Sequence, residues 1–352
     1  MFNGIQMVFL LYTRNYIVYL LLQIGATLVG NIASCWYGRR KYHHLLEHQH
    51  KSLPKEEFRG LFSNIRDVFT YKVGSTILSS IDNIIISILL GTILIGSVTN
   101  QVMLIGYGFL FIRLVIDNLT ASIGNLTVLE NAAKKEKVFN ELVFMSNWLA
   151  GVMGICLAVL IGPFIILWIG PEYAVSDSIV IVLVLGAYIM VVNQVVSLFR
   201  SSMGFLREAR FAPLAAAVLN VALSVWLGQL WGLFGVYLAT IIAYGCTVFV
   251  MDGILVVGRG LGKPAWGYFG RQFGYFFVSA GTYLLVWWLH GLLPLAGWGG
   301  WIIGAVFCFL LCNLVFFLVF GRTTAFRHLS TRLKELVGAR FGKKGNGAGN
   351  HE

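Results

Sequence analysis

Charged residues are scarce in this chain. Asp and Glu together number 15 among 352 residues, and charged residues of both signs make up 12% of the sequence. Soluble globular domains carry about 25%, so this composition excludes an ordinary soluble domain. Hydrophobic residues reach 58% of the chain and the mean hydropathy is +0.79. These values indicate a protein with most of its residues embedded in the hydrocarbon core of a membrane.

Cysteine and histidine are also few, with five and seven residues. The five cysteines all lie inside apolar runs and none has metal-ligand spacing, so we expect them to behave as small hydrophobic residues. No disulfide framework, metal site or cofactor is predicted. The sequence also shows no nucleophile beside a base, and we therefore do not expect an enzyme.

Lys and Arg are present but unevenly placed. Of the 26, all but Arg14 and Arg113 fall in five stretches, which span residues 39–72, 134–137, 200–210, 259–271 and 322–344. These stretches occupy every second gap between long apolar runs. Loops near a bilayer retain Lys and Arg on the cytoplasmic side, so the pattern predicts a multi-pass protein of the cytoplasmic membrane. We assign the net charge of +11 to these loops rather than to nucleic-acid binding.

Nine apolar stretches are long enough to cross a bilayer, which takes about 20 residues. They cover residues 12–36, 73–97, 100–128, 140–169, 178–199, 212–230, 232–256, 270–290 and 298–320. Because the basic loops are expected on the cytoplasmic side of the membrane, the linker 37–72 and the C-terminus are predicted to be cytoplasmic and the N-terminus to lie outside. The apolar fragment Ile5–Tyr12 is too short to cross, which suggests that an earlier helix is missing.

The polar stretch 37–72 divides the chain. Its second half, Phe58–Tyr71, gathers apolar side chains on one side, which predicts an amphipathic helix lying on the inner leaflet. A plain solvated linker helix is the alternative. The basic tail 321–352 ends in glycine-rich sequence that cannot build a core, and we expect part of it to be disordered.

Three charged residues lie deep inside the predicted spans: Asp82, Arg113 and Asp117. Asp252 lies near an inner end, from which it can reach the interface. Charges at depth are costly and normally face partners or water. Since the first two predicted helices after the linker are antiparallel, we expect the three deep side chains to meet near the midplane. Either Arg113 forms a buried pair that holds helices in register, or the group lines a transport cavity.

Several segments together resemble bacterial polysaccharide-biosynthesis flippases. The resemblance covers roughly residues 12–330. It is carried by Ser80-Ile-Asp-Asn-Ile-Ile-Ile-Ser87, Thr120-Ala-Ser-Ile-Gly-Asn125, Leu167-Trp-Ile-Gly-Pro-Glu-Tyr173, Phe205-Leu-Arg-Glu-Ala-Arg-Phe-Ala-Pro213, Val218-Leu-Asn-Val-Ala-Leu-Ser224 and Gly232-Leu-Phe-Gly-Val-Tyr-Leu-Ala-Thr240.

This resemblance implies the multidrug-and-toxin-exporter fold, an all-α arrangement of two six-helix bundles, often with two extra helices. Residues 1–36 would then hold the last helix of a truncated first bundle, and 37–72 the inter-bundle linker. Residues 73–256 would form the second bundle, 257–320 the extra pair, and 321–352 the tail. The implied function is to flip undecaprenyl-diphosphate-linked oligosaccharide, with membrane lipids and the polysaccharide polymerase and chain-length machinery as partners.

Under the same resemblance, the diphosphate and glycan would contact polar and basic residues of the cavity and its mouth: Arg113, Arg66, Lys72, Asn118 and Asn125. Asp82 and Asp117 would couple transport to an ion. Three alternatives stay open: a cation-coupled multidrug antiporter of the same fold, a membrane glycan polymerase or ligase, and an inactive truncated remnant. A polymerase would need a large outer loop with catalytic side chains, and the predicted outer loops are short.

Overall fold

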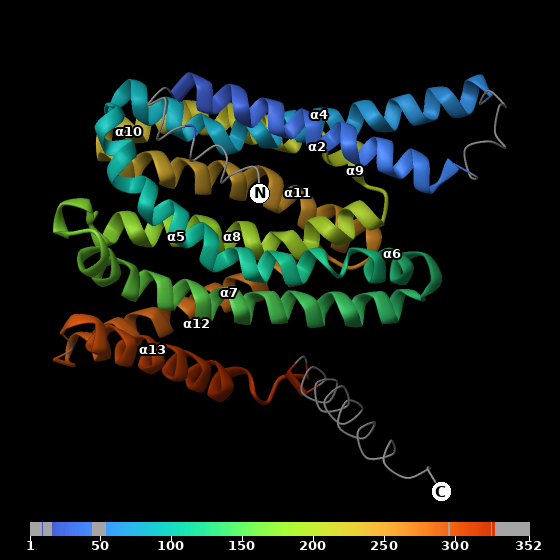
Figure 1. The fold of residues 1–352 in the computed structure, drawn as a ribbon. Coiled ribbons are helices and arrows are strands. Elements are labelled where there is room, and N and C mark those ends of the chain that lie inside the picture. Colours follow the sequence, from blue (N-terminus) through green and yellow to red (C-terminus); the bar gives the residue numbers. More distant parts are fainter. Residues whose placement is uncertain (1–8, 10–15, 44–53, 295, 325, 328–352) are drawn as a thin grey trace, which may run out of the picture. The chain divides into compact units, whose positions relative to one another are not determined.

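The computed structural model describes residues 9, 16–43, 54–294, 296–324 and 326–327. The chain divides into two compact units, Met1–Phe62 and Ser63–Glu352. Figure 1 shows the helices of both units, coloured along the sequence.

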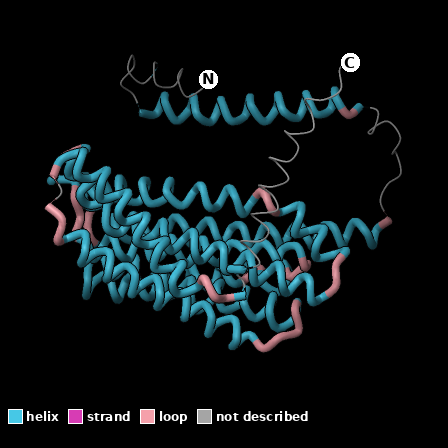
Figure 2. The backbone as a smooth tube through the Cα atoms, turned by 90° about the horizontal axis from the view of Figure 1, so that it is seen from below, coloured by secondary structure: helices cyan, strands magenta, loops and turns pink. Residues whose placement is uncertain are grey.

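The described residues form helices joined by loops, and no strand occurs among them (Figure 2). In chain order, the helices are α2(Tyr16–Lys41), α4(Lys55–Leu89), α5(Thr92–Asp117), α6(Thr120–Leu129), α7(Ala132–Trp168), η1(Pro171–Tyr173), α8(Asp177–Ser202), α9(Leu206–Ala209), α10(Ala212–Tyr244), η2(Gly245–Phe249), α11(Val250–Gly253), η3(Ile254–Gly260), α12(Ala265–Gly291) and α13(Gly297–Phe320). Within this part of the chain, seven helical segments are long and apolar enough to cross a membrane. The structure therefore fits the predicted all-α polytopic membrane protein, whereas the count of nine spans stays a prediction.

Helix α4 corrects the predicted boundary between linker and first span. The sequence predicts a surface helix over 58–71 and a separate span over 73–97. Instead α4 runs unbroken for 35 residues and ends at Leu89. No proline interrupts the backbone hydrogen bonds between the two predicted elements, and the chain turns at Leu90–Gly91, where glycine disfavours helix. The predicted span 100–128 is likewise divided, into α5 and α6.

Helix α10 reverses direction at Gly232. The Asn220 side-chain amide donates to the Thr240 hydroxyl at 2.7 Å, although 20 residues of straight helix would separate them by about 30 Å. Gly232 has φ 58° and ψ −135°, a conformation that other residues rarely adopt. Beyond the turn the two backbones lie very close together, because a Cβ placed on Gly235 would clash with the Leu227 carbonyl oxygen. The turn falls at the first residue of the predicted span 232–256, directly after the predicted span 212–230.

Helices α7 and α8 form the centre of the second unit. α8 packs against α5, α6, α7 and α10, and α7 also contacts α12 and α13. The two helices are apolar on nearly all faces, as expected of helices surrounded by others. Their core includes Phe139 and Phe199, whose rings meet edge to face at 5.1 Å between centroids.

The basic loops of the second unit lie together at one end of its helices, which we call the basic end (Figure 1). Lys263 lies 3.5 Å from Glu136, which joins the loop before α12 to the start of α7. The Thr127 hydroxyl donates to the Ser202 carbonyl at 3.2 Å and joins the ends of α6 and α8. This grouping is the arrangement that the alternating charge pattern requires of loops on one side of a bilayer.

Candidate functional site

A buried hydrogen-bond network surrounds Asp82 of α4. The Thr240 hydroxyl lies 2.9 and 2.8 Å from its two carboxylate oxygens, and the Asn220 amide donates to the carboxylate at 3.2 Å. Ser224 donates to Asn220 at 3.2 Å. Asn220 and Ser224 are fully buried and Thr240 is nearly so. The carboxylate thus joins α4 to both arms of the α10 hairpin.

Arg200 and Asp252 form a second buried group. The Arg200 guanidinium donates to the Asp252 carboxylate at 2.7 Å, and the two residues are 1% and 0% exposed. Asn193 donates to the other Asp252 oxygen at 3.0 Å. The sequence prediction that Asp252 reaches the interface is therefore wrong. Arg200, which the charge pattern assigns to a loop, points inward because it lies on the last turn of α8 rather than beyond it.

Tyr71 connects this pair to α4. The Arg200 guanidinium carbon lies 4.4 Å from the centre of the Tyr71 ring. This distance allows a cation–π interaction, which compensates part of the hydration that the guanidinium loses on burial. Tyr244 accepts from Asn193 at 3.0 Å. One ionic group therefore ties together α4, α8 and the second arm of the hairpin.

Asp67 forms a third group, nearer the start of α4. Its carboxylate is 2.7 Å from Arg210 and 3.4 Å from Arg66, and its side chain is 2% exposed. Arg66 is exposed, as is Lys72 one and a half turns further along α4. Both predicted mouth residues thus lie in the basic half of this helix.

Arg113, Asp82 and Asp117 do not meet as predicted. Asp117 accepts a hydrogen bond from Gln194 of α8 at 2.6 Å, whereas Asp82 is bound to α10. Arg113 is half-buried and forms no ion pair with either carboxylate. The difference arises because α5 packs on α8 while α4 packs on the hairpin, so antiparallel order in the chain does not make the two polar faces meet.

Polar side chains are exposed on two segments that are long and apolar enough to cross a membrane, Lys55–Leu89 and Val98–Leu129. On α5–α6 the exposed positions are Asp117, Asn118, Thr120, Ser122 and Asn125, and on α4 they are Thr76, Ser79, Ser80 and Asn83. We call these two sets the polar face. The helix is also interrupted within it, since Leu119 bonds the Ile116 carbonyl three residues back at 3.0 Å. Interrupted helices with polar groups at membrane depth are found where backbone lines a cavity or contacts protein.

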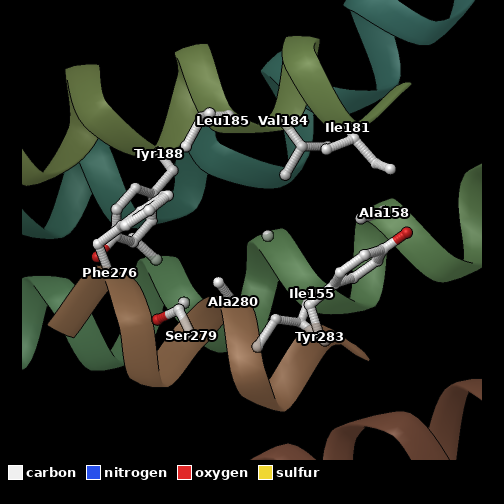
Figure 3. A pocket seen from close by; sticks show the side chains of 13 residues that line it. Ile155, Ala158, Ile181, Val184, Leu185, Tyr188, Phe276, Ser279, Ala280 and Tyr283 are labelled. Atoms are coloured by element: carbon white, nitrogen blue, oxygen red, sulfur yellow. The ribbon is translucent and has the colours of Figure 1, made fainter. Parts of the chain in front are cut away.

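The apolar cleft between α7, α8 and α12 has a different chemistry (Figure 3). Its volume is about 150 Å³ and Ile155, Val184 and Phe276 contribute to its walls. Tyr188 points into the cleft with its ring, while its hydroxyl donates to Asn147 at 2.7 Å. A cavity of about this size holds a benzene-sized molecule when its walls are apolar. It suits hydrocarbon and cannot hold a sugar.

The described residues contain no group of three or more His, Cys, Asp or Glu side chains that could hold a metal ion. The polar groups described above can form ion pairs and hydrogen bonds inside a mostly apolar helix bundle. The sequence alone identifies Asp82, Arg113 and Asp117, because they are charged residues within long apolar runs. It does not single out Arg200, since an arginine near a span end also fits a loop, nor Asn193, which shares the partner Asp252 with Arg200. Helix packing brings these residues together.

Comparisons with known proteins returned no match. No family model, curated protein or solved structure resembles the chain at a significant level.

Proposed function

We propose that this chain is a flippase that moves undecaprenyl-diphosphate-linked oligosaccharide across the cytoplasmic membrane by alternating access, for the synthesis of surface polysaccharide. A diphosphate and its sugars cannot cross hydrocarbon unaided. They need a hydrated, cationic path beside which the isoprenoid chain can remain in the bilayer. Rocking of one helical body against another would then open this path to each side in turn.

The polar face is the observation that supports the proposal. Exposed Asn, Ser and Thr side chains at membrane depth would be costly against lipid, and they require water, a second helical body or a polar cargo. Their chemistry, hydroxyls and amides with few charges, is suited to hydrogen bonding with sugars. Asn118 and Asn125 belong to this face and are the glycan contacts that we propose.

Arg113 supplies the positive charge for the diphosphate. It is half-buried and lies one turn from Asp117 on the same helix. A guanidinium binds phosphate oxygens in pairs and stays charged at every physiological pH. Arg66 and Lys72, exposed in the basic half of α4, would collect the headgroup before it reaches Arg113.

A flipping assay in proteoliposomes tests this proposal. The full chain is reconstituted with a fluorescent polyprenyl-diphosphate oligosaccharide, and loss of accessibility to an external quencher or glycosidase is followed over time. We expect Arg113→Gln to reduce the rate at least tenfold. The matched control is Arg259→Gln, which removes an exposed arginine at the basic end and should change the rate less than twofold.

Two results would count against the proposal. The first is an unmodified chain that moves no lipid-linked oligosaccharide above the rate of protein-free vesicles. The second is a normal rate in both Arg113→Gln and Arg113→Lys, which would remove the role of this arginine. Arg259→Gln also removes one positive charge, so comparison with it distinguishes the effect of losing Arg113 from the effect of losing any positive charge.

A cation-coupled multidrug antiporter is the second candidate, and Asp82 favours it. This carboxylate lies within α4, seven residues from its end at Leu89, held by uncharged donors alone among the described residues. Such a carboxylate is suited to exchanging a proton for a cationic drug. Uptake of ethidium into the same vesicles on an imposed proton gradient, without any effect of lipid-linked oligosaccharide, would favour this function over flipping.

A further inference from the structure

A cavity of about 560 Å³ opens at the basic end between the start of α7, the start of α12 and the end of α13. It is separate from the polar face, which lies on α4, α5 and α6. Lys137 of α7 and Arg271 of α12 both line it, and Asn140 and Thr323 add hydrogen-bonding groups. Deeper in, the walls become apolar with Val143, Val278 and Phe320.

Both cations are available to a ligand. Lys137 and Arg271 are exposed, and neither takes part in an ion pair among the described residues. Arg271 and Asn140 also line an adjoining cavity of about 220 Å³, so the guanidinium faces open space on more than one side. A guanidinium and an ammonium that line one cavity, together with an amide and a hydroxyl, are a donor set that suits phosphate oxygens.

The buried Glu141 also lines the cavity and is 4% exposed. A phosphodiester has two unesterified oxygens that share one negative charge, and one ammonium and one guanidinium are sufficient to bind them. The described lining contains no further Lys or Arg for the second phosphate of a diphosphate.

We propose that this cavity binds the phosphodiester headgroup of an anionic phospholipid from the adjacent leaflet. The position agrees with the chemistry, because Lys137 lies about one and a half turns into α7 and Phe320 is the last residue of α13. The site is thus at the level where headgroups meet hydrocarbon. Basic pockets between helices at this level bind anionic lipids, and the apolar floor offers contact for the first methylenes of the acyl chains.

Native mass spectrometry of the full chain in detergent tests the site. The probes are phosphatidylglycerol, phosphatidylcholine and inorganic phosphate, each titrated alone. We expect phosphatidylglycerol to bind at least tenfold more tightly than the other two probes, and Lys137→Ala/Arg271→Ala to lose that preference. The control, Lys135→Ala/Arg259→Ala, removes the same charge from residues outside the cavity lining and should keep it.

A second pair of variants leaves the charges in place. Gly274 lines the cavity, and a Cβ built on it meets no atom within 4 Å. Gly274→Leu should therefore fill part of the space without straining the helix and weaken phosphatidylglycerol binding at least fivefold. Gly270→Leu, on the same helix with equally open surroundings but outside the lining, should leave binding unchanged.

The proposal is overturned if phosphatidylglycerol binds the Lys137→Ala/Arg271→Ala and Gly274→Leu variants as tightly as the unmodified chain. It is also overturned if inorganic phosphate alone binds as tightly as the lipid, since the ligand would then be a free anion. Equal binding of phosphatidylcholine would exclude an anionic headgroup. None of these outcomes depends on flipping activity, so this site and the proposed function can fail separately.

Discussion

Arg200 and Asp252 are 52 positions apart in the sequence and face each other at 2.7 Å, with almost no exposed surface on either side chain. Two opposite charges buried in this way do not guarantee stability, because desolvation opposes their attraction. Loss of one partner is destabilising, however, since the remaining charge stays buried without an opposite charge. The pair thus fixes the position of α8 against α11, which follows the second arm of the α10 hairpin.

Arg200→Met should destabilise the protein by about 3–5 kcal/mol, the usual cost of leaving a buried charge alone. Arg200→Met combined with Asp252→Leu should recover most of this loss. Thermal unfolding in detergent, followed by loss of monomer on size-exclusion chromatography, measures both. Arg259→Met, at an exposed position, is the control and should unfold as the unmodified chain does. If the double variant is no more stable than Arg200→Met alone, the buried-charge explanation fails.

Gly235→Ala should destabilise the hairpin by about 1–3 kcal/mol, the range for overpacking a closely packed position. The added methyl group would clash with the Leu227 carbonyl oxygen, so one arm must move. Gly245→Ala is the matched control, since its added methyl meets nothing within 4 Å. The same thermal assay compares the two. Equal stability of both variants would mean that the arms of α10 do not approach each other at this point.

Asp82→Asn should separate a structural role from ion coupling. The amide preserves the shape of the side chain and can still bond Thr240, so we expect the folded protein to survive with a loss of about 1–3 kcal/mol. If Asp82 couples transport to protons, the flipping rate of this variant should no longer respond to an imposed pH gradient. Thr240→Val is the control, because it disturbs the same network and keeps the carboxylate. An unchanged gradient response in Asp82→Asn would exclude the coupling role.

Single cysteines in a background without the native cysteines should report the orientation of the helix ends. Lys137→Cys and Arg322→Cys lie at the basic end, whereas Glu172→Cys lies in the η1 segment, and all three positions are exposed. With an impermeant maleimide added to intact cells, only Glu172→Cys should react. Labelling after cell lysis confirms that the other two are reactive. Reaction of Lys137→Cys and Arg322→Cys from opposite sides would contradict the predicted topology.

The helical architecture can be predicted from sequence because each long apolar run carries its own signal. The positions of α7, α8 and α13 follow the predicted spans within a few residues at most ends, and the reversal of α10 falls at Gly232, the first residue of the predicted span 232–256. The grouping of basic loops at one end follows from their alternation along the chain. These features depend on composition within a window and need no knowledge of packing.

The site is less predictable, because it depends on how each helix is rotated about its axis. Asp82 is recognisable as a deep charge, but its partners Asn220 and Thr240 lie on two arms of a hairpin whose register no local pattern reveals. The burial of Arg200 is hard to predict, because an error of one turn in the predicted end of its helix decides whether the arginine lies in a loop or in the helix. The sequence also does not reveal that α4 is one continuous helix. An amphipathic segment followed by an apolar segment predicts two separate helices unless the backbone is known to continue through both.

The Asp82 network also has a mechanical meaning. One carboxylate is held by both arms of the hairpin, and the arms are bonded to each other through Asn220 and Thr240. Sliding α4 past the hairpin would have to break the bonds of Asp82 to Asn220 and to Thr240 together, so these elements should move as a single rigid block. Flexing in this half of the molecule is then left to the interrupted backbone at Asn118–Leu119, where a shorter hydrogen-bonded turn joins two helical rods.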